Sequence, residues 1–316
     1  MQLAQCELEE IPALIGGFLL LRMLDLSDNK LEAIPSDIGN CFSLKKLNIS
    51  SNKITNIPEE LAQLIHLKEF YFYSNRIVEL PEWVGKMNLT NLNGFNNKIL
   101  PLPLTLGGLS DLSELNLSCN VIMQLPPAAI ANWRSVTILT LFDCRLLQLP
   151  SLGHLESLQE LRLFNNNLEV VPDLGTKLGS LRVVEINKNR ISALPLSFFS
   201  GLRALEKINL AHNSIDAVPV GINCPKLEHF LINNNNLTEL PPDLPLWPSL
   251  RVLFVNVNQL QRLPETFLQN TQIERINLSR NSRLTVPSKH ILQHLKKVIE
   301  GKPAALGAKY WAPDSL

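Results

Sequence analysis

Short stretches of alternating apolar and polar residues recur along this chain about every two dozen positions. The stretch from Leu44 to Asn52, LKKLNISSN, returns in related form from Leu21, Leu112, Leu158 and Ile273. Its first, fourth and sixth places are apolar, which is the period-2 pattern of a β-strand with one buried face. A unit that recurs at this period cannot bury its apolar face alone, so the pattern predicts that the copies stack on one another.

Twelve such units follow one another at spacings of 22 to 24 residues. They begin at Leu21, Leu44, Leu67, Leu89, Leu112, Val136, Leu158, Leu181, Leu205, Leu227, Leu250 and Ile273. We therefore expect twelve short parallel strands in a single elongated solenoid that extends over residues 1–287, rather than two globular domains.

Two further places in the unit hold the same residue type almost throughout. The ninth place is an asparagine in eleven of the twelve units; in the seventh unit we assign this asparagine to Asn167. In the sixth unit the ninth place is Cys144. We expect this amide to hydrogen-bond backbone groups of its own and the next repeat. The fifteenth place is always proline, from Pro35 to Pro287. Proline lacks an N–H and has a fixed φ, so it should open a short turn on the side opposite to the strands.

The combined pattern, L-x-x-L-x-L-x-x-N-x-L-x-x-[IL]-P, resembles the leucine-rich repeat family over residues 3 to 287. The resemblance implies an α/β solenoid: a curved parallel β-sheet on the concave face and short helical, 3-10 or extended segments on the convex face. We count about twelve repeats plus a partial N-terminal one. The I/L-P ending and the period of about 23 look most like the intracellular Ras-group repeats, such as the Shoc-type Ras scaffold and the Scribble-like polarity proteins.

The two ends of the solenoid differ. Residues Leu3 to Pro12 match only the later part of a repeat, which predicts an uncapped edge. Such an edge belongs to a truncated fragment or is covered by a partner or a second copy, so self-association is one expectation. At the other end, Ser288 and an apolar stripe predict a capping helix over 288–301, followed by a tail over 302–316 that Tyr310 and Trp311 anchor.

Composition narrows the classes of partner and the compartment. The 29 basic and 29 acidic residues cancel, so we expect no nucleic acid partner and no membrane insertion. Five scattered cysteines without C-x-x-C pairs favour reduced thiols and a cytoplasmic chain. Sequons at Asn48, Asn88, Asn116, Asn236 and Asn277 point the other way, although the repeat itself writes N-L-S.

The third, fifth and seventh places should point out of the concave sheet and form the binding surface. In the first two repeats these places hold mostly small polar residues, and aromatic residues occur there from the third to the seventh repeat. The predicted partner-binding residues are Tyr71, Tyr73, Asn93, Phe95, Asn116, Ser118, Phe142, Phe164, Arg162 and Glu185. Exposed aromatics resemble protein-binding hot spots, and a bulky partner side chain would fit over Ser118. A secondary patch comprises Leu231, Val252 and Phe254.

Structural interpretations of these residues remain open. The aromatic side chains can instead stack across strands and simply cover the sheet. Gly94 occupies a core-facing sixth place next to a repeat with Phe70 and Phe72, which indicates either exchange of volume or a cavity beneath Phe95. Arg162, Glu185 and Lys207 lie on consecutive predicted strands and should form an internal charge ladder.

The candidate catalytic residues do not form a known catalytic motif. His290 and His294 have helical spacing without the glutamate of an H-E-x-x-H site, and His212 and His229 lack a nucleophile. We expect no metal and no cofactor, and therefore a non-enzymatic module that binds a signalling protein. The resemblance implies a small GTPase, a phosphatase or a kinase pathway component as partner. The alternatives are a secreted or cell-surface recognition protein and the substrate-recognition part of a larger effector enzyme.

Overall fold

The computed structural model describes residues 1–285, 291, 293, 294, 296 and 297. The chain divides into two compact units, residues 1–158 and residues 159–316. The first unit contains strands β1 (Met23–Asp25), β2 (Lys46–Asn48), β3 (Glu69–Tyr71), β4 (Asn91–Asn93), β5 (Glu114–Asn116) and β6 (Ile138–Thr140). The second contains β7 (Glu160–Arg162), β8 (Val183–Glu185), β9 (Lys207–Asn209), β10 (His229–Leu231), β11 (Val252–Phe254) and β12 (Arg275–Asn277).

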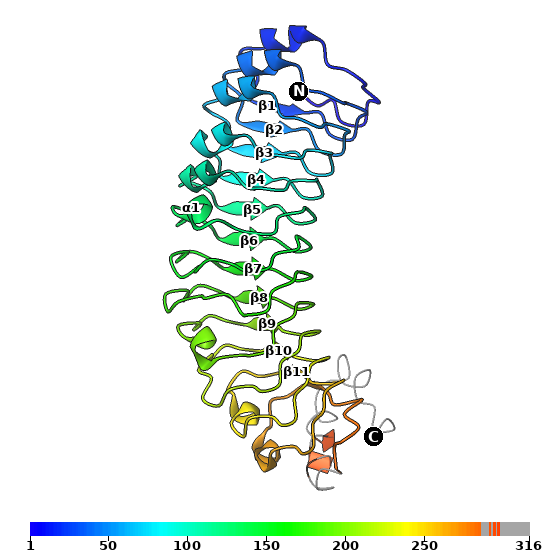
Figure 1. Ribbon diagram of the computed structural model, residues 1–316, viewed down its shortest axis with the longest axis vertical. Helices are drawn as coiled ribbons and strands as arrows, with labels where there is room; N and C mark the ends of the chain where they lie inside the picture. The colour runs from blue at the N-terminus through cyan, green and yellow to red at the C-terminus, as the bar shows by residue number, and fades with distance from the viewer. Residues whose placement is uncertain (286–290, 292, 295, 298–316) are drawn as a thin grey trace. The chain divides into compact units, whose positions relative to one another are not determined.

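Each unit is a ladder of parallel strands in chain order (Figure 1). Neighbouring strands pair in a constant register, with Leu24 opposite Leu47 in the first unit and Phe230 opposite Leu253 in the second. Every strand has a buried central residue, because the fourth place of each repeat faces the core. The prediction of twelve short parallel strands is confirmed for the described residues.

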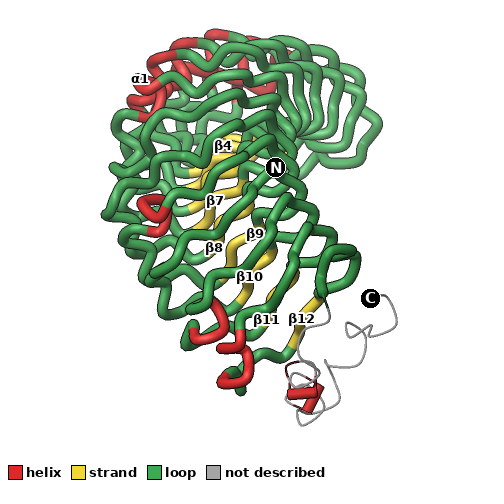
Figure 2. Tube along the Cα trace, turned by 60° about the horizontal axis from the view of Figure 1, so that its bottom comes forward, coloured by secondary structure: helices red, strands yellow, loops and turns green. Residues whose placement is uncertain are grey.

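Short helices lie away from the strand ladder and follow the repeat prolines (Figure 2). In the first unit they are η1 (Ala13–Gly17), η2 (Ser36–Asn40), η3 (Glu59–Gln63), η4 (Glu82–Lys86), η5 (Leu104–Gly108) and α1 (Pro127–Ile130); in the second they are η6 (Leu196–Phe199), η7 (Leu244–Leu246) and η8 (Glu265–Gln269). Pro35, for example, precedes η2 with φ −65° and ψ 140°. The ring suits this entrance, since proline has no N–H to donate. The predicted role of the prolines is confirmed where a helix follows.

The repeat asparagines close the turn after each strand with one amide. In Asn120, Nδ2 donates to the carbonyls of Gly94, Leu117 and Ser118 at 3.0, 2.8 and 3.3 Å, and Oδ1 accepts from the Ile99 N–H at 2.9 Å. The amide therefore serves its own repeat and the preceding one, and the expectation that it reaches the next repeat is wrong. The reason is geometric: each turn directs one carbonyl and one N–H towards the repeat that follows it.

Two repeats differ from the others in this column of asparagines. In the seventh repeat Asn166, not Asn167, is the buried amide, and it donates to the Leu163 carbonyl at 2.9 Å; the assignment to Asn167 is wrong by one position. In the sixth repeat the Cys144 thiol donates to the Leu117 carbonyl at 3.3 Å. A thiol thus keeps part of the donor role, although it is a weak donor and a weak acceptor.

The residue before each asparagine has a left-handed backbone. These eighth-place residues have φ values between 53° and 57° in every described repeat, although none is glycine. Aspartate, serine and asparagine tolerate this region, whereas Val257 at φ 54° is β-branched and strained there. The turn therefore imposes one unfavourable backbone conformation per repeat, which the neighbouring amide bonds must offset.

Gly94 makes room for a large neighbour. A Cβ at this position would lie 2.3 Å from Cε2 of Phe72, and Phe72 is completely buried against Phe70 with ring centroids 4.9 Å apart. The interpretation as exchange of volume is confirmed, and no cavity lies beneath Phe95 at this point because the Phe72 ring fills the space.

The ends match the expectations in part. Residues 1 to 12 lie along the first repeat, where Gln2 forms a parallel bridge with Asp25 and Cys6 donates its N–H to Asn29 Oδ1. Of the predicted capping helix over 288–301, residues 291, 293, 294, 296 and 297 are described and helical. Ser288 and the rest of that segment, as well as the tail over 302–316 with Tyr310 and Trp311, lie outside the described residues. Self-association through the N-terminal edge stays a prediction.

We expect Gly94→Ala to lower the free energy of unfolding by about 1–3 kcal/mol, because the added methyl group overlaps the Phe72 ring. Urea unfolding followed by circular dichroism measures the change. Gly17→Ala is the matched control, since a Cβ there meets no atom within 4 Å. On a Phe72→Leu background the cost of Gly94→Ala should shrink; an unchanged cost on that background would show that overlap with Phe72 is not the cause.

Candidate functional site

The candidate site is the open face of the sheet, which we define as the side chains in the third, fifth and seventh places of the repeats. Strand alternation turns these side chains away from the core. In the first unit the open face carries Tyr71, Tyr73, Asn93, Phe95, Asn116, Ser118 and Phe142, and in the second it carries Arg162, Phe164, Glu185, Leu231, Val252 and Phe254. Most of these side chains are half-buried, whereas Ser118 and Val252 are buried, so their role in binding stays a prediction.

One end of the first unit's open face is a three-membered polar cluster. The Lys46 ammonium lies 2.8 Å from Oε2 of Glu69 and 4.8 Å from the centroid of the Tyr71 ring, and the Tyr71 hydroxyl donates to the same Glu69 oxygen at 3.0 Å. The Lys46 hydrogen bond holds the pKa of Glu69 below its usual range. Burial, and then the bond to Glu69, raise the pKa of Tyr71 to about 12.

Lys46 was not among the predicted binding residues, so this cluster was not predicted. A signal was available, because Lys46 and Glu69 occupy the third place of consecutive repeats and pair directly across the strands. Opposite charges at such a cross-strand position attract each other. The contact fixes the tyrosine ring between two charged groups, so that Tyr71 is presented in one orientation.

The middle of this face is an aromatic pair over a serine. The rings of Phe95 and Phe142 lie 5.9 Å apart at an interplanar angle of 51°. These two residues belong to the fourth and sixth repeats, and Ser118 in the fifth is completely buried, with its Oγ accepting the Phe142 N–H at 3.0 Å. The expectation that a bulky partner side chain sits over Ser118 is not supported, because Ser118 is completely buried, as is Ser50 in the same place of the second repeat.

The predicted asparagines shape the backbone as well as the surface. Oδ1 of Asn93 accepts the Phe95 N–H at 3.1 Å, and Oδ1 of Asn116 accepts the Ser118 N–H at 3.1 Å. Asn48 makes the same bond to Ser50. Each of these three asparagines thus holds the backbone of the seventh-place residue of its own repeat, which is aromatic only at Phe95.

In the second unit the open face begins with charges. Arg162 lies 2.5 Å from a Glu160 oxygen and 3.6 Å from a Glu185 oxygen, and Lys207 lies 2.6 Å from the other Glu185 oxygen. The predicted charge ladder of Arg162, Glu185 and Lys207 is confirmed. Phe164 follows this ladder and is half-buried.

The secondary patch is smaller than expected. Val252 is only 7% exposed, whereas Leu231 and Phe254 are half-buried. Val252 lies directly opposite His229 on the neighbouring strand, and burial lowers the pKa of His229. Two apolar side chains, rather than three, are therefore accessible there.

The other predicted chemical groups have structural partners. His212 lies 3.4 Å from the Asn234 amide, and His294 contacts the Asn270 carbonyl at 2.7 Å. No group of three or more potential metal ligands occurs within the part of the chain that the structure describes. None of the helices in that part is long and apolar enough to cross a membrane.

Family models for leucine-rich repeats match this chain in two stretches. A leucine-rich repeat region matches residues 1–121, and a leucine rich repeat model matches residues 179–237. Together with the repeated strand, asparagine turn and proline, these matches define the class. The chain is a leucine-rich repeat protein, and its fold is the leucine-rich repeat solenoid. Proteins of this class bind protein partners.

Similar proteins of several kinds share these repeats. Human leucine-rich repeats and immunoglobulin-like domains protein 3 is 26% identical over 49% of this chain, and PH domain leucine-rich repeat protein phosphatase 1 of Rattus norvegicus is 29% identical over 56%. The chain covers only 14% and 9% of the lengths of these relatives. Osteomodulin of Rattus norvegicus is 30% identical over 58% of this chain and 39% of its own length.

Two solved structures share the fold over most of the chain. A leucine-rich repeat protein of Leptospira interrogans aligns with a TM-score of 0.71, 22% identity and coverage of 96% of this chain and 94% of its own. An internalin from Listeria monocytogenes aligns with a TM-score of 0.67 and 22% identity, over 84% of this chain and 83% of its own. At this identity the likeness establishes the fold alone.

We expect the stability of the protein to fall between about pH 10 and pH 12 through Tyr71. Its raised pKa of about 12 means that the folded state keeps the phenol proton while the unfolded chain loses it above about pH 10, so the stabilisation is present below that pH and is lost above it. Ultraviolet titration of tyrosinate measures the pKa directly.

Glu69→Gln should lower the pKa of Tyr71 without restoring its ordinary value, because burial is the larger cause and remains. Tyr71→Phe identifies the signal of Tyr71 in the titration and serves as the control. An unchanged Tyr71 titration in Glu69→Gln would contradict the assigned contact.

Proposed function

We propose that this chain is a non-enzymatic, cytoplasmic interaction module whose first unit binds a signalling protein on its open face. The observation that carries the proposal is the ordered aromatic surface of Tyr71, Tyr73, Phe95 and Phe142. All four rings are half-buried; Lys46 lies over the Tyr71 ring, and the Phe95 and Phe142 rings contact each other. A surface that is already ordered loses little conformational entropy when a partner binds.

The chemistry of this face supports binding rather than catalysis. The pKa shifts of Glu69 and Tyr71 are explained by burial and by Lys46, Glu69 and Tyr71 contacting one another. Aromatic side chains with a polar tip are frequent among the residues that dominate protein interfaces. The polar cluster beside them would orient a partner through charge.

The identity of the partner rests on resemblance. The I/L-P ending and the repeat period support membership of the intracellular Ras-group class, for which a small GTPase, a phosphatase or a kinase pathway component is the expected partner. On the second unit, Arg162, Phe164 and Glu185 remain proposed contacts, and Leu231 and Phe254 a proposed second patch.

Replacement of the aromatic side chains should abolish partner capture. We expect Tyr73→Ala/Phe95→Ala/Phe142→Ala to lose a partner that the wild-type protein retains from cell extract, since central aromatic residues commonly contribute about 2 kcal/mol or more each to binding. Phe18→Ala/Phe42→Ala is the matched control, because these two exposed aromatic side chains of the first unit lie outside the open face. Quantitative mass spectrometry of the captured proteins, with thermal unfolding to confirm that each variant folds, provides the comparison. Equal capture by wild type and by the triple variant would refute the proposed face.

The alternative, a secreted or cell-surface recognition protein, makes a different prediction at the sequons. Oδ1 of Asn116 accepts the Ser118 N–H, and a glycan on Asn116 would cover the open face. If this face binds a partner, the chain secreted from mammalian cells behind an added signal peptide should carry no glycan at Asn116. Asn88, which is exposed in the turn before β4, is the internal reference. Mass spectrometry that finds Asn116 fully glycosylated would contradict a secreted protein that binds its partner through the open face.

A further inference from the structure

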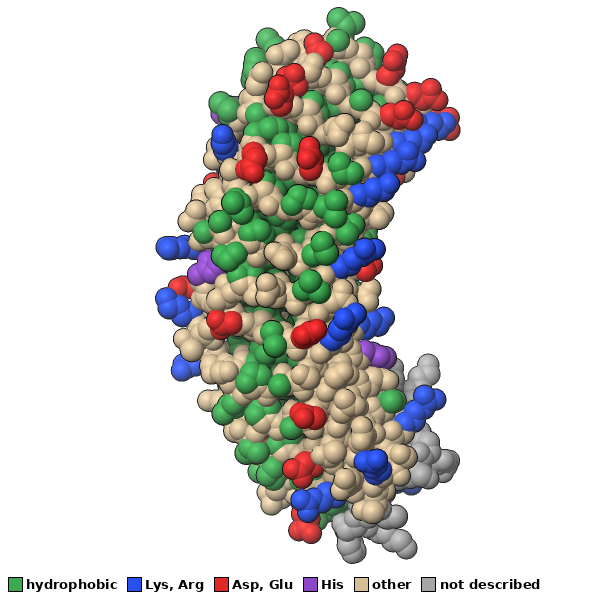
Figure 3. Space-filling model, viewed as in Figure 1, with side chains coloured by type: hydrophobic (Ala, Val, Ile, Leu, Met, Phe, Trp, Pro, Cys, Tyr) green, Lys and Arg blue, Asp and Glu red, His purple; other side chains and the backbone are tan. Residues whose placement is uncertain are grey.

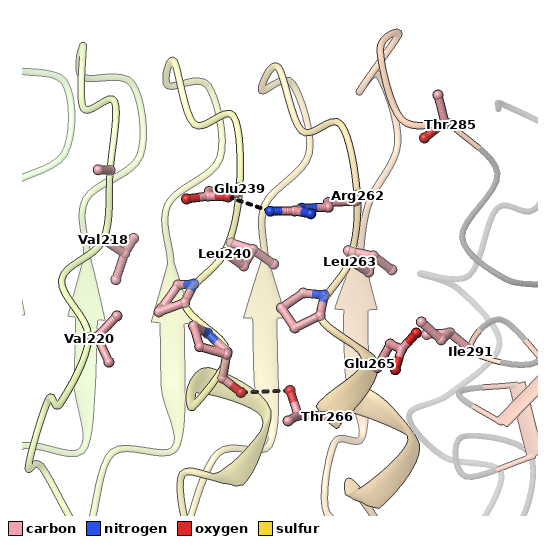
Figure 4. A pocket seen from close by; sticks show the side chains of 14 residues that line it. Val218, Val220, Glu239, Leu240, Arg262, Leu263, Glu265, Thr266, Thr285 and Ile291 are labelled. Carbon is pink, nitrogen blue, oxygen red and sulfur yellow. Dashed lines mark hydrogen bonds and ion pairs between the residues drawn. The ribbon is translucent and has the colours of Figure 1, made fainter.

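A row of cations follows the asparagine turns of the first unit. The tenth place holds Lys30, Lys53, Arg76 and Lys98 in four consecutive repeats, and all four side chains are exposed. Each of their backbone N–H groups donates to a carbonyl of the preceding repeat at 2.8 to 2.9 Å, so that the four residues stack directly over one another. Figure 3 shows a row of Lys and Arg side chains along one edge of this unit.

Most of this row has no neutralising neighbour in its own turns. Lys30 lies 3.2 Å from the Glu7 carboxylate. For Lys53, Arg76 and Lys98, the flanking eighth and twelfth places carry no charge: they are Ser51, Ser74 and Asn96, and Thr55, Val78 and Leu100. Glu79 in the thirteenth place of the third repeat is the acidic residue closest along the chain. The protein thus keeps a positive strip although its net charge is zero.

An apolar row overlaps the row of cations in the third and fourth repeats and continues into the fifth and sixth. The twelfth place holds Val78, Leu100, Met123 and Leu147, which are 44%, 49%, 51% and 51% exposed. Leu100 donates its N–H to the Val78 carbonyl and Leu147 to the Met123 carbonyl, at 3.3 and 3.2 Å. These side chains are therefore stacked as regularly as the cations, and the two rows share the turns of the third and fourth repeats, where Val78 follows Arg76 and Leu100 follows Lys98. A contiguous row of half-exposed apolar side chains is typical of a contact surface.

We propose that these two rows, which we call the edge surface, bind an acidic amphipathic α-helix of a protein partner. Successive repeats are about 4.8 Å apart, which is close to the helix pitch of about 5.4 Å, so one helical turn would meet each repeat. The long side chains of Lys53, Arg76 and Lys98 absorb the small difference. An extended peptide presents same-face side chains about 6.8 Å apart, so its side chains would not stay aligned with successive repeats.

The chemistry of the two rows sets the two stripes of the helix. A glutamate or aspartate stripe would lie along Lys53, Arg76 and Lys98, and an adjacent leucine-like stripe along Val78, Leu100, Met123 and Leu147, as in helix-in-groove recognition. The second to sixth repeats span about 19 Å, which corresponds to about 13 helical residues. A partner rich in phosphate alone would leave the apolar row uncovered, which is why a protein helix fits better than a nucleic acid or a lipid surface.

A designed peptide tests the proposal directly. The probe is a fluorescent helical peptide of about 16 residues with glutamates at i, i+4 and i+7 and leucines at i+5, i+8, i+12 and i+15, so that the acidic stripe covers the second to fourth repeats and the apolar stripe the third to sixth. We expect saturable binding in fluorescence anisotropy, weakened by added salt because exposed charges are screened. Lys53→Glu/Arg76→Glu/Lys98→Glu should weaken it at least about tenfold, and Val78→Ser/Leu100→Ser/Met123→Ser should weaken it as well.

Matched controls separate this surface from the open face. Lys188→Glu/Arg190→Glu reverses two exposed cations of the second unit and should leave binding unchanged, as should Tyr73→Ala/Phe95→Ala/Phe142→Ala. The proposal is overturned if a peptide of the same composition in scrambled order binds equally well, or if the triple charge reversal has no effect. Binding of phosphatidylserine vesicles or single-stranded RNA to the wild-type strip, without affinity for the peptide, would also overturn it.

Discussion

The buried asparagine amide is the interaction on which the rest of this solenoid depends. Each repeat must turn sharply after a strand of three residues, and that turn leaves carbonyl and N–H groups without partners inside a water-excluded stack. Asn120 satisfies three carbonyls and one N–H at once, while only 5% of its surface is exposed. Leaving such groups unpaired costs about 1–3 kcal/mol each, so a side chain with both a donor and an acceptor is needed at every turn.

This arrangement leaves most side chains of the open face and of the edge outside the core of the stack, although Asn93, Asn116 and Ser118 bond the backbone there. Core leucines and turn asparagines hold the stack, and the outward third, fifth, seventh, tenth and twelfth places are left to vary. The first unit uses that freedom twice. Tyr71, Phe95 and Phe142 form an ordered aromatic face, and Lys53, Arg76 and Lys98 form a charged strip on the turns. Two chemically distinct surfaces can therefore be carried by one set of repeats.

How far the sequence predicts this structure depends on the range of each contact. The columns of leucine, asparagine and proline predicted the strands, the core and the helix entrances, because each is set by the repeat itself. The contact between Phe95 and Phe142, two repeats apart, was not predictable in this way, and neither was the burial of Ser118, which Ser50 shares in the same place of the second repeat. The cluster around Tyr71 required the strand register, which pairs Lys46 with Glu69.

Other differences have a similar cause. The left-handed eighth-place residues carry no common side chain, from Asp28 to Val257, so only the backbone shows that they share one conformation. Val252 looks exposed by alternation and is nevertheless 7% exposed, because neighbouring side chains cover it. Alternation predicts the direction of a side chain, and the accessible area depends on its neighbours.

The backward reach of the asparagine amide makes the stack polar along its axis. A repeat contributes its own amide to the repeat before it and receives the corresponding bonds from the repeat after it, as Asn52 does for Leu31 and Asn75 for Ile54. The two ends of any array built this way are therefore chemically unequal. At its beginning an amide lacks backbone partners and can be hydrated, whereas at its end the backbone itself lacks an amide.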